Sequence, residues 1–112
     1  MAFKSVLEIV NNVAKITLTG ELDAAAAVEF RADVEKAAEA KVKAVALLMS
    51  GLEYMASAGL RALVFAKQKM GTQVEIFMIG AQETVTETIT MTGFQNSVTF
   101  LDVYDAVKIE GA

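Results

Sequence analysis

The chain of 112 residues is 54% hydrophobic and carries a formal net charge of -4, which predicts one compact domain, 1–112, that does not bind nucleic acids. Because it contains no cysteine and no histidine, thiol and imidazole catalysis, disulfides and the usual transition-metal ligands are excluded, and we expect no enzyme activity, cofactor or metal site. Its N-terminus has no apolar signal core and no apolar run reaches the roughly 18 residues that span a bilayer, so we expect a soluble, cytoplasmic protein without membrane contact.

The first part of the chain predicts two strands and a helix. Residues 6–10 and 13–19 read as β-strands, with the alternation of apolar and polar side chains clearest in the second. Asn11 and Asn12 lie between them, and because asparagine tolerates positive φ, a two-residue turn should join them as an antiparallel hairpin. Residues 24–40 place apolar side chains on one helical face, which predicts an amphipathic helix with Asp23 as its N-cap.

The middle of the chain predicts a buried strand and a second helix. Residues 42–49 are apolar without alternation, which is typical of a central strand covered on both faces in a parallel sheet. Residues 50–54 are interpreted as a loop that leads into a helix over 57–70. Gly71 supplies the C-terminal signal of that helix.

The last part of the chain continues this alternation. A strand is predicted over 72–79, a helix over 82–91, a strand over 97–100 and a helix over 102–109. The complete order predicts a single α/β domain with a mixed, mostly parallel sheet, an N-terminal antiparallel hairpin and about four helices.

Ser57 is the strongest candidate functional residue, because it stands where a predicted helix begins. A serine there can cap the helix, since its hydroxyl accepts a hydrogen bond from an unpaired backbone N–H. The same position suits a phosphate, because free N–H groups and the positive end of the helix dipole would stabilise a phosphoryl group. Its small neighbours Ala56, Ala58 and Gly59 would let another protein reach the hydroxyl. The helix start alone leaves both interpretations open.

Asp23 is expected near Ser57, because the segments that contain them follow strands whose carboxyl ends should meet at one edge of the sheet. Its carboxylate could orient the Ser57 hydroxyl for attack on a phosphodonor held by another protein, or it could only cap its own helix. Without a histidine or a nearby lysine, the pair is not a nucleophilic triad.

Two large apolar residues, Met55 and Phe94, fall in segments predicted as loops. Exposed apolar side chains beside Ser57 would form a patch on which a partner protein docks. The alternative is that both residues belong to the core.

Four short segments carry recognisable patterns along nearly the whole chain: Gly20-Glu21-Leu22-Asp23-Ala24, Met49-Ser50-Gly51-Leu52, Tyr54-Met55-Ala56-Ser57-Ala58-Gly59-Leu60-Arg61 and Thr92-Gly93-Phe94. Their combination and order resemble the STAS domain of bacterial anti-sigma factor antagonists. In that family the serine that matches Ser57 is phosphorylated by a partner anti-sigma factor serine kinase, and a separate serine phosphatase of the metal-dependent class reverses this. The resemblance implies a substrate and binding partner of these proteins, not a catalyst.

Two positions depart from the family pattern. Many members carry an acidic residue where this chain has Leu48, and many carry Asp or Ser where it has Ala56, so negative charge and hydrogen-bonding capacity beside the serine are lost. Two hypotheses result. The first is a phosphorylation-controlled switch that binds an anti-sigma factor kinase when Ser57 is unphosphorylated. The second is a STAS module that senses a small ligand or acts as a scaffold, without regulation by phosphorylation.

Overall fold

The computed structural model describes residues 3–71 and 73–110. Strands alternate with helices along most of the chain, in the order that the sequence predicts. The elements are β1 (Lys4–Val10), β2 (Val13–Leu22), α1 (Ala24–Glu39), β3 (Ala44–Met55), α2 (Ser57–Met70), β4 (Glu75–Ile79), α3 (Glu83–Thr90), the 3-10 helix η1 (Phe94–Ser97), β5 (Thr99–Leu101) and α4 (Ala106–Glu110).

The five strands form one sheet in the order β1-β2-β3-β4-β5. β1 runs antiparallel to β2, and every other neighbouring pair is parallel. Parallel neighbours need a crossover connection, which α1, α2 and α3 provide in turn. The single α/β domain with an N-terminal hairpin confirms the predicted fold class, and β3 is the central strand as predicted.

The turn between β1 and β2 forms for the reason that the sequence indicates. Asn11 and Asn12 adopt φ values of 50° and 66°, and asparagine reaches this left-handed region at a smaller cost than most residues. Val10 then pairs directly with Val13. The predicted two-residue hairpin is confirmed.

β3 is longer than the sequence predicts. Residues 50–54 were expected to form a loop, but strand pairing continues to Met55, which lies opposite Leu22 of β2. The register shifts twice, between Thr17 and Thr19 and between Gly20 and Glu21 of β2, and at each shift β3 has one extra residue, as in a β-bulge that lets a strand bend and stay paired. Serine and glycine in this segment favour a loop locally, whereas the neighbouring strand supplies partners that make it part of the sheet.

The last third of the chain differs from the prediction at its boundaries. Residue 72 of the predicted strand lies outside the described residues, and the strand itself begins at Glu75. The last strand and the last helix begin later than predicted, at Thr99 and Ala106. Phe94 opens a 3-10 helix and does not lie in an irregular loop.

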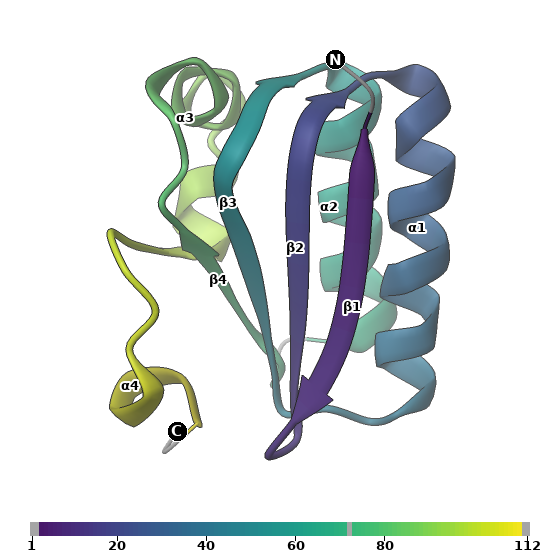
Figure 1. Ribbon diagram of the computed structural model, residues 1–112, viewed down its shortest axis with the longest axis vertical. Helices are drawn as coiled ribbons and strands as arrows, with labels where there is room; N and C mark the ends of the chain where they lie inside the picture. The colour runs from purple at the N-terminus through teal and green to yellow at the C-terminus, as the bar shows by residue number, and fades with distance from the viewer. Residues whose placement is uncertain (1–2, 72, 111–112) are drawn as a thin grey trace.

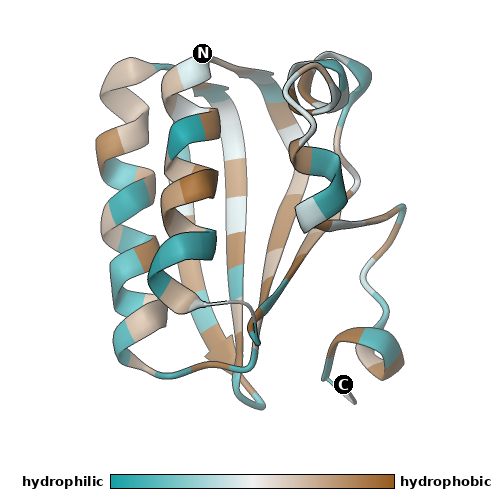
Figure 2. Ribbon diagram, turned by 180° about the vertical axis from the view of Figure 1, so that it is seen from behind, coloured by the Kyte–Doolittle hydropathy of each residue, from teal (hydrophilic) through white to brown (hydrophobic). Residues whose placement is uncertain are grey.

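α1 and α2 lie side by side across one face of the sheet (Figure 1) and are seen from outside in the reverse view (Figure 2). The main core lies between these helices and the strands, with Phe30, Leu63 and Ile16 fully buried. α3 adds Val85 and Ile89 to the same core. None of the helices in residues 3–71 and 73–110 combines the length and the hydropathy of a membrane-spanning segment.

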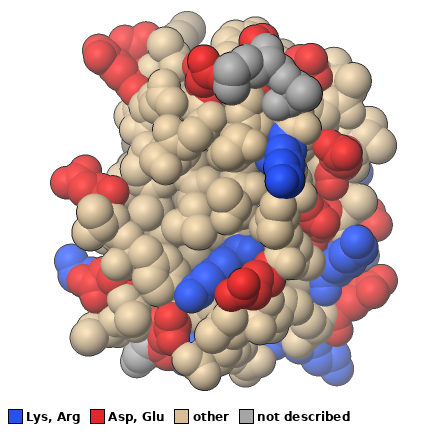
Figure 3. Space-filling view, viewed as in Figure 1, with Lys and Arg blue, Asp and Glu red and all other residues tan. Residues whose placement is uncertain are grey.

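The opposite face of the sheet carries α4, which closes a second, smaller core around the buried Ile109. The Glu110 carboxylate accepts hydrogen bonds from Tyr104 Oη at 2.5 Å and from Asn11 Nδ2 at 2.6 Å, and these bonds lower the pKa of Glu110. Burial, followed by the bond to Glu110, raises the pKa of Tyr104 to about 12. Charged side chains lie mostly around the edge of this face (Figure 3). We assign the Glu110 cluster a structural role, because its carboxylate ties α4 to the turn between β1 and β2 and pairs with Lys15 of β2 at 3.7 Å.

Candidate functional site

The ends of β2 and β3 bring two of the sequence-predicted segments together. The Ala56 N–H donates a hydrogen bond to the Leu22 carbonyl oxygen, with a distance of 2.9 Å between N and O. Asp23 and Ser57 are the next residues along each chain segment, so both lie at the edge of the sheet from which α1 and α2 start (Figure 1). The two segments meet at the carboxyl ends of neighbouring parallel strands, as the predicted topology requires.

One interpretation of the sequence expected Ser57 to cap α2, but it does not. It is the first residue of the helix, and the cap position is taken by Ala56, which has an extended backbone and no side-chain oxygen. The Ser57 side chain is exposed, and within the described part of the chain its hydroxyl makes no hydrogen bond. The hydroxyl is therefore not committed to a structural bond and is accessible to another protein.

The backbone at the start of α2 has unused donors. The Gly59 and Leu60 N–H groups both donate to the Ala56 carbonyl oxygen, at 2.9 and 3.1 Å, whereas those of Ser57 and Ala58 have no acceptor among residues 3–71 and 73–110. Such N–H groups, together with the helix dipole, favour negative charge at this end of α2. A phosphoryl group on the Ser57 oxygen would place charge beside them.

Asp23 caps α1, as the sequence predicts. Its Oδ1 accepts a hydrogen bond from the Ala26 backbone N–H at 2.9 Å. The structure contains no hydrogen bond between the Asp23 carboxylate and the Ser57 hydroxyl. Asp23 thus has a demonstrated capping role, and its second oxygen remains available for the orienting role predicted from the sequence.

Gly59 serves packing rather than access. It is buried, and a Cβ atom added to it would lie 2.7 Å from Leu22 Cγ and 3.1 Å from Met55 Cγ. Only a glycine lets the first turn of α2 approach the end of β2 this closely. Ala56 and Ala58 are half-buried, so of the three small neighbours of Ser57 these two border the accessible surface.

The interpretation of Met55 as an exposed docking residue is wrong. Its side chain is 2% exposed and belongs to the main core, because β3 continues through this position and turns it toward the helices. Phe94 is half-buried and packs against the same core. The exposed apolar side chains nearby in sequence are Tyr54 and Met91, with 48% and 86% of their surface accessible, and sequence reasoning missed both.

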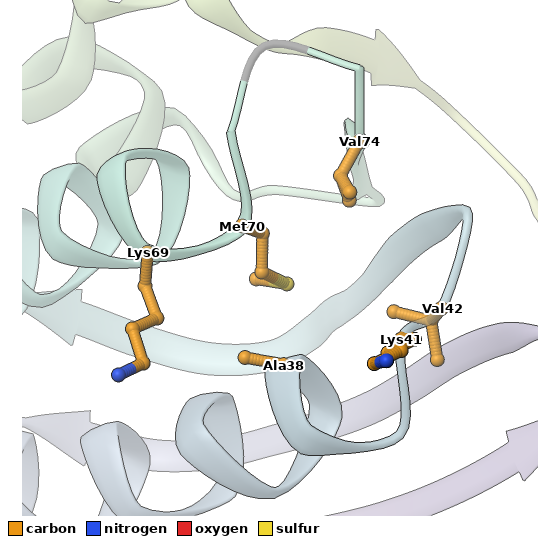
Figure 4. A pocket seen from close by; sticks show the side chains of 6 residues that line it. All are labelled: Ala38, Lys41, Val42, Lys69, Met70 and Val74. Carbon is orange, nitrogen blue, oxygen red and sulfur yellow. The ribbon is translucent and has the colours of Figure 1, made fainter.

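A cavity lies at the far end of the helix pair from Ser57. It has a volume of about 230 Å³ and is lined by the last turns of α1 and α2 and the approach to β4, including Ala38, Met70 and Val74 (Figure 4). Sites for small molecules in proteins usually measure about 300–1,000 Å³. This cavity is therefore smaller than a usual small-molecule site, and a larger hollow of about 660 Å³ lies beside the start of α1.

Comparison with known families gives a match over nearly the whole chain. The sequence model of the STAS domain family matches residues 4–108. Among curated protein sequences, none is significantly similar to the chain.

Solved structures share the fold at low sequence identity. An anti-sigma factor antagonist from Mycobacterium paratuberculosis has a TM-score of 0.85 and 18% identity, over 96% of this chain and 92% of that one. The anti-sigma factor antagonist SpoIIAA in its unphosphorylated form has a TM-score of 0.73 and 20% identity, over 88% of this chain and 87% of that one. The Bacillus cell fate determinant SpoIIAA in its phosphorylated form has a TM-score of 0.67 and 19% identity, over 88% of this chain and 90% of that one.

Proposed function

Since the chain belongs to the STAS domain family, we propose that it is an anti-sigma factor antagonist that binds an anti-sigma factor kinase while Ser57 is unphosphorylated. The observation that carries this proposal is the position of Ser57, exposed on the first residue of α2 with its hydroxyl unbonded. The similar structures support it, because they are anti-sigma factor antagonists and one of them is known in unphosphorylated and phosphorylated forms.

The chain would contribute only the acceptor hydroxyl to the reaction. The Ser57 oxygen attacks the γ-phosphorus of ATP held by the kinase, ADP leaves, and the hydroxyl proton passes to a base of the kinase. The free N–H groups of Ser57 and Ala58 would favour the product, since unpaired N–H groups at a helix start stabilise added negative charge. A serine phosphatase of the metal-dependent class would remove the phosphate.

Phosphorylation would act on binding through charge. A phosphate adds about -1.5 to -2 charges at an exposed point of a chain whose net charge is already -4. This charge would repel acidic groups of the kinase and prevent docking, so that the kinase is free to hold its sigma factor.

Replacement of Ser57 by alanine tests the proposal. Incubation with ATP and anti-sigma kinases from the same genome should give one phosphate per wild-type chain, mapped to Ser57 by mass spectrometry, and none in Ser57→Ala. Because the side chain is exposed and unbonded, the stability of the variant should stay within about 0.5 kcal/mol of wild type. Ser50→Ala, at an exposed serine of β3, is the matched control and should be phosphorylated normally. Phosphate that persists in Ser57→Ala would overturn the assignment.

Replacement of Asp23 by asparagine tests the orienting role of its carboxylate. Asparagine caps helices nearly as well as aspartate, so the hydrogen bond to the Ala26 N–H can be kept and thermal stability should change little. We expect phosphorylation of Ser57 to slow, because the variant has no carboxylate to accept a hydrogen bond from the hydroxyl and orient it. Kinase assays under single-turnover conditions measure this rate. A native rate in Asp23→Asn would leave Asp23 with its capping role alone.

A further inference from the structure

A groove runs between α1 and α2 and starts beside Ser57. Ala58, the residue after Ser57, lines it together with Val28, Phe65 and two arginines, Arg31 and Arg61; its volume is about 370 Å³. The remaining lining residues are alanines. The two helices that line it form the outer layer on one face of the sheet (Figure 2), and Ser57 is exposed at the start of α2, so another molecule can reach the groove and the Ser57 hydroxyl at the same time.

The charge of the groove is opposite to that of the molecule as a whole. Both charged side chains that line it are arginines, although the chain has a net charge of -4. In the described residues neither guanidinium forms an ion pair. Asp23, which precedes α1 at the Ser57 end, has one carboxylate oxygen engaged by the Ala26 N–H. Glu35 lies one turn after Arg31 and lines an adjoining hollow with it, but within the described residues it does not pair with Arg31. The groove therefore offers two cations that are not held in an ion pair.

The side chains of the groove also have apolar surface and one ordered cation. Val28 is 71% exposed, which is unusual for a large apolar side chain on a helix that packs on a sheet. The Arg31 guanidinium lies 4.2 Å from the centre of the Phe65 ring. This cation–π contact holds Arg31 in place before any partner arrives, which lowers the entropy lost on binding.

We propose that this groove is the docking site for an acidic, amphipathic segment of the partner protein. Carboxylates pair with guanidinium groups through two parallel hydrogen bonds, and an apolar side chain of the same segment would cover Val28 and Phe65. A second copy of this chain does not fit, because a two-fold contact through the groove would place the same arginines against each other. A basic segment is disfavoured by the same like-charge repulsion.

The groove connects docking to the proposed switch, and this step rests on the proposed function. Ser57 and Arg61 lie one turn apart on α2, a spacing at which opposite charges on a helix interact. A phosphate on Ser57 would pair with Arg61 and add negative charge at the entrance of the groove. An acidic segment would then lose one of its two cations and meet an anion.

The groove can be tested without the kinase. The 15N-labelled full chain is titrated with a helical peptide of about 15 residues that has leucines on one face and glutamates on the other, and with the same peptide carrying lysines for glutamates. The glutamate peptide should shift the amide signals of Val28, Ala58, Arg61 and Phe65, with an affinity that falls as salt is added. The lysine peptide should not bind there. No shift at these residues, or equal binding of both peptides, overturns the proposal.

Single substitutions locate the charge effect. Arg31→Ala and Arg61→Ala should each weaken binding of the glutamate peptide about two- to fivefold, the range expected for one exposed ion pair. The control is Lys36→Ala, which removes an exposed cation of α1 that does not line the groove, and it should bind like wild type. An equal loss in Lys36→Ala would assign the binding to net charge and overturn the site.

The two proposals fail in different ways. If the glutamate peptide binds the groove but no kinase phosphorylates Ser57, the proposed function fails and the docking site stands. If Ser57 is phosphorylated but the peptide does not bind, the docking site fails alone. Ser57→Asp should weaken peptide binding more in the wild-type background than in Arg61→Ala, and equal weakening in both would overturn the coupling through Arg61.

Discussion

Replacement of Met55 by alanine should lower the free energy of unfolding by about 2–5 kcal/mol, the range for truncation of a buried methionine. Met55 is 2% exposed and packs where the end of β3 meets the first turn of α2. Its truncation removes apolar contacts and leaves a cavity that the rigid strand cannot close. Urea unfolding followed by circular dichroism gives the stability of each variant.

Met91 provides the matched control for this measurement. It is a methionine that is 86% exposed at the end of α3, so Met91→Ala should change stability by no more than about 0.5 kcal/mol. If Met55→Ala were as stable as Met91→Ala but bound the partner more weakly, the burial of Met55 would not describe the protein in solution. The docking patch first predicted from the sequence would then be restored.

The sequence predicts those parts of the fold whose causes are local. Asn11 and Asn12 indicate the hairpin because their own backbone preferences suit the turn. Asp23 indicates the start of α1 because a capping side chain bonds only three residues away, at Ala26. The apolar stripe of α1 predicts a helix with one buried face, and the uniform apolar run in β3 predicts a buried strand, because both patterns lie within the element itself.

The end of β3 could not be predicted in this way, because its cause lies in another strand. Residues 50–54 include serine and glycine and favour a loop when considered alone. They are extended because β2 continues beside them as far as Leu22, with two register shifts. The error about Met55 follows directly, since a residue at the end of a paired strand has a side that faces the core.

The functional site was predicted only in part, because some of its contacts depend on how distant segments pack. The meeting of the two segments that contain Asp23 and Ser57 follows from strand order, which the alternation of elements predicts. The groove of Arg31, Arg61 and Phe65 was not predicted, because these residues belong to two helices and their contact depends on how the helices pack. The available signal in the sequence was Val28, a large apolar residue between the polar positions of α1 and outside its buried stripe.

Gly59→Ala should destabilise the protein by about 1–3 kcal/mol, although alanine is the better helix former. In an open helix this substitution gains about 1 kcal/mol. At Gly59 the new Cβ would lie 2.7 Å from Leu22 Cγ and 2.9 Å from Leu22 Cδ2. Leu22 is fully buried, so its side chain could give way only by shifting within the packed core, and overpacking should outweigh the gain in helix propensity.

A double-mutant cycle with Leu22→Ala isolates this contact, because shortening Leu22 makes room for the added methyl group. The cost of Gly59→Ala should fall by at least about 0.5 kcal/mol in the Leu22→Ala background, as expected for residues in direct contact. Relief of the clash by movement of α2 would also displace Ser57 from the end of β2, so folded Gly59→Ala should be phosphorylated more slowly than wild type. Additive stabilities together with a native phosphorylation rate would show that the start of α2 shifts without cost, and that close packing at Gly59 does not position Ser57.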